Sequence, residues 1–336
     1  MQTAGPFAEE GIILLKIQEK KNRRPQFSPF PGYPPYLSIY PQYSMAGILY
    51  SLGAAFFWSI AVVLFRKSGD TMSPVSLNLF KCLIALALLV PTLVVLGIPF
   101  FPECPVSDWW ILALSGIVGV TVADLFFFAS LSRLGASLSA VVGCLYLPTV
   151  ILLSYLFLDE RLGPNGLIGG AFVLAALIVS SLHGKGAAVG KRDFVIGLML
   201  GFLGILGLVV GILLVKEILN RSDVAWATTM RLFFAFLGMM VLMAFHPQRR
   251  RFWKEMMPSD SWRWAVPASI TGNYFALLCW LAGMKYTFVS LAAILNQLST
   301  IMIFILAALF LGERITVNRS ISIALAVVGA VVAVFN

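Results

Sequence analysis

Charge is scarce in this sequence. Asp, Glu, Lys and Arg make up only 12% of its 336 residues, whereas hydrophobic residues make up 60%, and the mean hydropathy is +0.92. Soluble globular domains carry about 25% charged residues. The composition therefore excludes an ordinary soluble domain and predicts a protein that lies in a lipid bilayer.

The residue sets of common catalytic sites are also missing. The only histidines, His183 and His246, fall at the ends of apolar segments, and the sequence has neither an H-E-x-x-H motif nor a P-loop. Zincin-type proteases and ATP-driven pumps are thereby excluded. An intramembrane aspartyl protease needs two membrane aspartates, and only Asp124 lies deep in an apolar segment. We predict that the protein is not an enzyme.

Cysteine usage excludes two further classes. The chain has four cysteines and no C-x-x-C pair, so neither a disulfide framework nor a zinc site is indicated. We predict no metal and no cofactor. The cysteines are Cys82, Cys104, Cys144 and Cys279.

Long stretches without charge are what the sequence has instead. About 20 apolar residues cross a bilayer core as a helix, and a helix satisfies its backbone hydrogen bonds internally. We predict an all-α integral membrane protein with ten transmembrane helices. The predicted spans are 46–65, 75–97, 109–131, 137–158, 163–182, 194–215, 224–245, 262–284, 287–311 and 317–335.

The net charge of +9 fits the same class. A strongly basic soluble protein would suggest a nucleic-acid partner. Here Lys and Arg concentrate at the ends of apolar segments and in short loops, where membrane insertion places them. We therefore expect the lipid bilayer as a partner and no nucleic acid.

Residues 1–44 differ from the rest of the chain. Six prolines stand between Pro25 and Pro41, a density that prevents helix and sheet. We expect this leader to be disordered. Met45 directly precedes the first predicted span, which suggests that Met45 is the natural start and that the leader is not native.

The C-terminal part of the chain repeats its middle. When Trp109–Leu162 is aligned without a gap on Trp262–Ile315, 16 of 54 positions are identical, against roughly a tenth expected by chance in such apolar sequence. The first copy covers 46–182 and the second covers 194–335. Each copy holds five predicted spans. Since five is odd, the second copy must enter the membrane upside down, which predicts two inverted five-helix repeats.

Both copies end in the same short pattern. The sequence Leu-Phe-Leu-x-Glu-Arg-[Leu/Ile] occupies 156–162 and 309–315. Each occurrence is weak evidence alone, but twice at this spacing the pattern resembles the EamA-type members of the drug/metabolite transporter superfamily. Further matches between the copies are Ala129 with Ala282, Ser137 with Ser290, and Lys81 with Arg231.

The resemblance covers about 46–335. It implies ten spans in two EamA repeats, export of amino acids, other small metabolites or toxic compounds, and a place in the plasma (cell inner) membrane with both termini cytoplasmic. Loop charge favours the opposite orientation. With both termini cytoplasmic, the basic loops 185–192 and 249–254 would lie outside, against the usual bias. Orientation, coupling ion and oligomeric state stay open.

Three charged residues lie clearly inside the predicted spans: Lys81, Asp124 and Arg231. A charge in hydrocarbon costs roughly 2.5–3.5 kcal/mol even on insertion scales, so such residues face protein or water and are functional candidates. We predict that Lys81 and Arg231 attract a carboxylate or other anion and that Asp124 recognises a cation or couples protons. Alternatively, the two basic residues snorkel to the headgroups, and Asp124 forms a structural ion pair or hydrogen bond.

Aromatic and amide side chains at similar depth complete the candidate substrate-binding residues. Deep amides hydrogen-bond another helix or a ligand. Asn296 and Gln297 replace Gly143 and Cys144 of the first copy, so a cavity that they line would be chemically asymmetric. Trp280 lies at similar depth. The candidates are Trp58, Tyr146, Asn273, Tyr274, Asn296 and Gln297.

Glu160 and Glu313 end the fourth predicted span of each copy, beside an arginine. We interpret them as interfacial ion pairs or helix caps rather than substrate contacts.

Together these features favour a secondary transporter of a small metabolite or amino-acid-like solute, working as an exporter by alternating access. A non-transporting membrane assembly subunit and a lipid-linked sugar flippase component are the alternatives. An assembly subunit or a flippase component would tolerate neutral substitution of Lys81, Asp124 and Arg231, whereas the proposed transporter would not.

Overall fold

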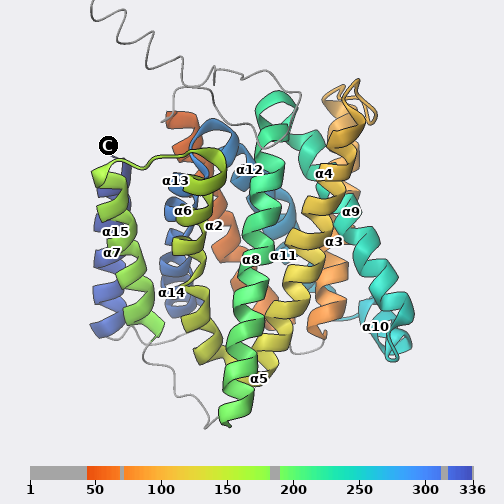
Figure 1. The fold of residues 1–336 in the computed structure, drawn as a ribbon. Helices are drawn as coiled ribbons and strands as arrows, with labels where there is room; N and C mark the ends of the chain where they lie inside the picture. Colours follow the sequence, from red (N-terminus) through yellow and green to blue (C-terminus); the bar gives the residue numbers. More distant parts are fainter. Residues whose placement is uncertain (1–43, 69–71, 182–189, 312–316, 335–336) are drawn as a thin grey trace, which may run out of the picture. The chain divides into compact units, whose positions relative to one another are not determined.

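The computed structural model describes residues 44–68, 72–181, 190–311 and 317–334. The proline-rich leader and Glu313 lie outside these ranges. Within them every regular element is a helix, as the sequence predicts (Figure 1). The helices are α2 (Met45–Ser68), α3 (Pro74–Val95), α4 (Val106–Gly116), η1 (Ile117–Val122), α5 (Ala123–Gly143), α6 (Tyr146–Leu158), α7 (Pro164–Ser181), α8 (Lys191–Arg221), α9 (Val224–Phe245), α10 (Arg249–Met256), α11 (Trp262–Ser269), η2 (Ile270–Ala276), α12 (Leu277–Tyr286), α13 (Val289–Asn296), α14 (Leu298–Leu311) and α15 (Val317–Val334).

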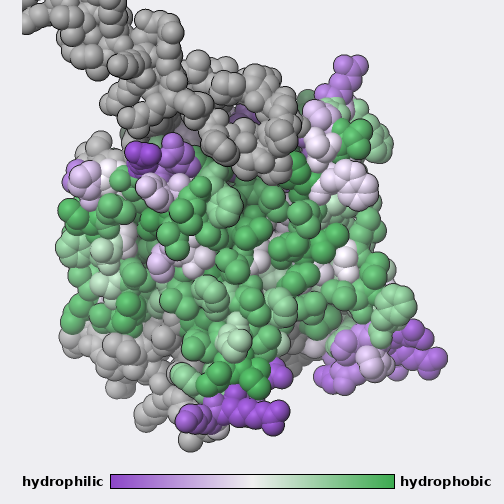
Figure 2. Space-filling model, viewed as in Figure 1, coloured by the Kyte–Doolittle hydropathy of each residue, from purple (hydrophilic) through white to green (hydrophobic). Residues whose placement is uncertain are grey.

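The helices have the length and apolarity of membrane spans. Six stretches of the described chain are long and apolar enough to cross a bilayer, and four apolar helices are shorter. Many large hydrophobic side chains point outward, and Figure 2 shows a broad apolar surface over the described helices, with hydrophilic side chains at its two ends. Water would penalise such a surface and lipid would not. The prediction of a multi-pass integral membrane protein is confirmed, whereas the count of ten spans stays a prediction.

The two copies share a local irregularity at the same place. In each copy the α-helix widens into a π-helical segment, η1 in the first and η2 in the second. The sequence alignment pairs η1 with the first six residues of η2. It also pairs Gly116, the last residue of α4, with Ser269, the last residue of α11. The duplication found in the sequence is therefore a duplication of backbone conformation.

Glycine lets the helices around η1 approach closely. A Cβ added at Gly211 of α8 would lie 2.5 Å from Cα of Gly119 in η1, and one added at Gly116 would lie 2.3 Å from the carbonyl oxygen of Arg231 in α9. Small residues permit this backbone contact between helices in membranes. The close packing fixes α8 and α9 against the π-helical segment, where the polar residues of the site lie.

One boundary differs between the copies and from the prediction. The sequence predicts a loop at 132–136, but α5 is helical through that stretch, whereas the second copy breaks at Thr287 and Phe288, between α12 and α13. Two charged side chains hold the ends of this break. Lys216 donates to the carbonyl oxygens of Met284 and Thr287, and Glu160 accepts from the first backbone N–H groups of α13. These caps satisfy groups that a broken helix would otherwise leave unpaired.

Candidate functional site

The N-terminal half of α3 carries the first part of the site. Ser73 caps the helix, Pro74 occupies its first position, and the helix then places Asn78 and Lys81 one turn apart on one face. Both face Asp124 at the start of α5. Nδ2 of Asn78 donates to Oδ2 of Asp124 at 2.6 Å, and Nζ of Lys81 lies 3.8 Å from the same oxygen.

This ion pair is only partly shielded. The Lys81 side chain is 19% exposed and that of Asp124 is 29% exposed, whereas Asn78 is buried. An ion pair with some access to water gains less than a dry pair but also loses less solvation. The pair is therefore neither fully dry nor fully solvated.

Arg231 is the second part of the site and is buried more deeply, at 3% exposure. Its helix, α9, begins at the cap Asp223 and runs beside α4. Nε of Arg231 donates to Oγ of Ser115 at 2.9 Å, and Ser115 in turn donates to the carbonyl oxygen of Gly211. Ser115 of α4, itself held by α8, thus positions the guanidinium. The Nη2 of Arg231 is buried and has no hydrogen-bond partner among the described residues.

Two more buried donors without a partner lie close to Arg231. The guanidinium carbon is 6.0 Å from the ring centroid of Trp280 on α12, and Arg231 interacts electrostatically with Tyr146 at the start of α6 and with Asp124. Nε1 of Trp280 and the hydroxyl of Tyr146 lack partners among the described residues, as does Oδ1 of Asn78. Buried polar groups are nearly always satisfied, so this concentration of unsatisfied groups needs an explanation.

The structure thus brings together four of the nine predicted site residues. Lys81, Asp124, Arg231 and Tyr146, together with Asn78, Ser115 and Trp280, form what we call the α3–α9 polar cluster. It draws on both copies of the repeat.

The other candidates lie elsewhere. Tyr274 shares a hydrogen bond of 2.7 Å with Thr92, further along α3, and Trp58 packs beside Gly272 of η2. In the part of the chain that the structure describes, no hydrogen bond, ion pair or ring contact joins the remaining candidates to the cluster. These are Asn273, Asn296 and Gln297.

Glu160 has a structural role. Its Oε1 accepts from the backbone N–H of Val289 at 2.8 Å, and its Oε2 accepts from the N–H and the hydroxyl of Ser290 at 3.1 and 2.8 Å. It therefore caps a helix, as the sequence suggests, but the helix belongs to the second copy and is not the next one along the chain. A negative charge at a helix N-terminus is stabilising.

Sequence reasoning missed three residues. Asn78 stands three positions before Lys81, a helical spacing that places both on one face and that could have revealed it. Ser115 gives no signal of its own, because one serine in an apolar helix is common. Lys216 stands just after the predicted span 194–215, where a lysine is ordinary, although the structure shows it partly buried and hydrogen-bonded to backbone carbonyls.

Two helical repeats with membrane-length apolar helices and a shared cluster of charged and polar side chains define a multi-pass integral membrane protein of duplicated design. The sequence matches the EamA-like transporter family twice, over residues 45–182 and 195–335, and the chain belongs to that family.

A curated relative agrees with this membership, and a solved structure has a similar fold. An uncharacterised transporter of Archaeoglobus fulgidus is 26% identical over 190 residues, which are 56% of this chain and 65% of the relative. The match thus spans less than two thirds of that protein's length. The crystal structure of another protein is similar, with a TM-score of 0.73 at 21% identity, over 85% of this chain and 96% of the other. The structural likeness concerns the fold alone.

Proposed function

We propose that the protein is a secondary transporter that exports a small metabolite or amino-acid-like solute by alternating access. Membership of the EamA-like transporter family supports this class. The observation that carries the proposal is the group of buried donors around Arg231: its own Nη2, Nε1 of Trp280 and the hydroxyl of Tyr146 have no partner among the described residues.

A carboxylate on the solute would satisfy these donors. Leaving a buried donor unpaired costs about 1–3 kcal/mol, and an ionised carboxylate accepts through two oxygens with about four lone-pair sites. A guanidinium binds such a group with strong, directional hydrogen bonds. Because Ser115 already holds Nε of Arg231, the guanidinium is oriented before a solute arrives.

Asp124 supports recognition of a positive group on the same solute. It is an acid within electrostatic range of Arg231, and its partial exposure leaves one side open to exchange. A solute with both a carboxylate and an ammonium would therefore match Arg231 at one end and Asp124 at the other. This pairing favours an amino-acid-like zwitterion, with a proton at Asp124 as the alternative cation.

The paired π-helical segments support alternating access. Such segments occur frequently at functional sites, and here they stand at equivalent positions in two copies, next to Arg231 in one case and next to Trp58 in the other. In transporters with inverted repeats, the two copies exchange conformations around a shared site. Ten spans, inversion of the copies and the plasma (cell inner) membrane are parts of this proposal.

Uptake into proteoliposomes tests it. The purified protein is reconstituted, and four labelled solute classes are compared: amino acids, matched amines without the carboxylate, matched acids without the amine, and neutral sugars. We expect amino acids to be transported best. Arg231→Gln should raise the KM for carboxylate-bearing solutes several-fold, since the anion loses its main donor.

The matched control is Arg263→Gln, which removes the same charge from an exposed position on α11 and should leave KM unchanged. Absence of uptake for every class, in protein that keeps its melting temperature, would support a non-transporting subunit. Lipid-linked sugars are measured as a separate, fifth class, and movement of these alone would support the flippase alternative.

A further inference from the structure

α10 is a short amphipathic helix between α9 and α11 that the proposed function does not use. Its eight residues, Arg-Arg-Arg-Phe-Trp-Lys-Glu-Met, include four bases and one acid. Phe252 and Met256 are buried in a cluster with side chains of α3, α9 and α11. On its outer side, Arg250 and Lys254 stand one turn apart and are exposed. The helix is therefore fixed to the protein by one face and presents positive charge on the other.

The exposed side forms a surface cavity of about 470 Å³, lined by Arg250, Arg251, Lys254 and Glu255. Among the described residues, the side chains of Arg250 and Lys254 make no hydrogen bond and no ion pair. Both are free to bind an anion.

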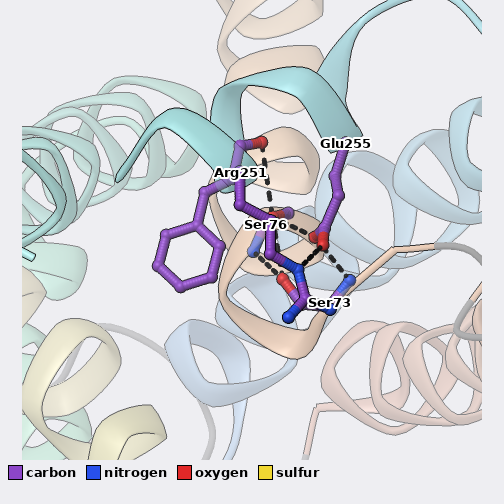
Figure 3. Close-up of polar contacts among 5 residues, drawn as sticks. Ser73, Ser76, Arg251 and Glu255 are labelled. Atoms are coloured by element: carbon purple, nitrogen blue, oxygen red, sulfur yellow. Dashed lines mark hydrogen bonds and ion pairs between the residues drawn. The ribbon is translucent and has the colours of Figure 1, made fainter. Parts of the chain in front are cut away.

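The acid in this cavity is already fully engaged (Figure 3). Oε2 of Glu255 accepts from the backbone N–H of Ser73 at 2.9 Å and from Oγ of Ser76 at 2.7 Å, and Oε1 accepts from Nε of Arg251 at 2.8 Å. The start of α3 and one edge of Arg251 thus offset its charge. The Arg251 side chain is still 67% exposed, so its terminal nitrogens remain available for a second partner.

We propose that Arg250, Arg251 and Lys254 form a binding site for the phosphate of an anionic membrane lipid such as phosphatidylglycerol. The exposed aromatic Trp253, on the same helix, and the exposed Met257 that follows it point to a lipid rather than a soluble phosphate. Amphipathic helices of this kind bury such side chains at the level of the headgroups. Each basic residue near an anionic membrane surface contributes about 1 kcal/mol.

The position of α10 relative to the membrane agrees with this assignment. It follows the end of α9 directly and precedes α11, which begins at Trp262 and also carries Trp264. Tryptophans gather at the boundary between hydrocarbon and headgroups. In Figure 2 the hydrophilic side chains of the α10 region, labelled in Figure 1, adjoin the apolar surface of the long helices.

Tryptophan quenching in nanodiscs tests the site directly. The full chain is placed in phosphatidylcholine nanodiscs that contain a small fraction of either brominated phosphatidylglycerol or brominated phosphatidylcholine. The signal of Trp253 is the difference between the unaltered protein and Trp253→Phe. We expect several-fold stronger quenching by the brominated phosphatidylglycerol at equal mole fraction.

Two variants distinguish a site from general attraction. Arg250→Gln/Lys254→Gln should abolish the preference while leaving the bond between Arg251 and Glu255 intact. Lys191→Gln/Arg192→Gln, which removes the same charge from exposed residues at the start of α8, should keep it. Phosphatidylglycerol should also raise the melting temperature of the unaltered protein more than that of the first variant, because a ligand stabilises the state that binds it.

Three results would overturn the proposal. They are equal quenching by the two brominated lipids, equal loss of preference in the two double variants, and displacement of the brominated phosphatidylglycerol by millimolar inorganic phosphate. The last result would assign the site to free phosphate. A failure of solute uptake leaves this proposal unaffected, since quenching requires no transport.

Discussion

Gly119 leaves the space that the Arg231 side chain occupies. A Cβ at Gly119 would lie 3.1 Å from Nη2 of Arg231 and 2.9 Å from Cα of Gly211. The first distance involves the nitrogen that has no partner among the described residues and that we propose for substrate binding. The second involves the backbone of α8, which cannot rotate away. A glycine of η1 therefore determines where the guanidinium lies.

Gly119→Ala should destabilise the protein by about 1–3 kcal/mol, as overpacking does in a close-packed interior, and should also weaken binding of carboxylate solutes. Gly143→Ala is the matched control, because a Cβ there meets no atom within 4 Å and alanine favours helix. Melting temperature and KM measure the two effects. Equal melting temperatures for both variants would contradict the close contact.

Asp124→Asn should lower stability by about 1.5–3 kcal/mol, the range for hydrogen bonds to charged groups. The change leaves Lys81 without its acid and gives Asn78 a weaker acceptor. Asp124→Asn/Lys81→Met should recover part of the loss, which a double-mutant cycle measures. If instead Asp124→Asn keeps the melting temperature but ends dependence of transport on a pH gradient, Asp124 couples protons. No change in either would eliminate both roles.

Glu160→Gln should cost about 1–3 kcal/mol, because an amide presents a donor to the donors of α13 and removes the charge from its N-terminus. Ser290→Ala should cost less, since it deletes only one of the three bonds that Glu160 accepts. Hydrogen exchange at the first turn of α13 should increase more in the first variant. The reverse order of effects would show that Glu160 is not the cap that holds the break.

Glu255 should make stability depend on acid pH. Burial raises the pKa of its carboxyl, but hydrogen bonds from Ser73, Ser76 and Arg251 outweigh burial and lower the pKa from 4.5 to about 2. Because the pKa is lower in the folded protein, Glu255 stabilises the fold fully when the pH is above 4.5, the pKa of its carboxyl in the unfolded chain. This stabilisation is lost as the pH falls toward 2. Melting temperatures from pH 6 to pH 3 should fall more for the unaltered protein than for Glu255→Gln. Parallel curves would contradict the assignment.

Part of the candidate site could be predicted from the sequence because it depends on charge alone. Lys81, Asp124 and Arg231 stand out in apolar stretches, since a charge in hydrocarbon has few acceptable environments. Ser115 and Gly119 do not stand out, because their importance comes from Arg231, which is 116 positions from Ser115. The sequence predicts a loop for the basic segment that begins at Arg249, because a helical pattern of only eight residues is too short to indicate a helix.

The sequence by itself determined the membrane class, the two copies and the family, because each rests on apolar length, residue identity and spacing along the chain. Only the tertiary structure decided that the first copy stays helical through 132–136, that Glu160 caps the helix beyond the break at Thr287, and that Arg231 keeps one buried nitrogen without a partner among the described residues. These features depend on which helices lie side by side. Contacts between residues more than a hundred positions apart are set by packing, which no local pattern records.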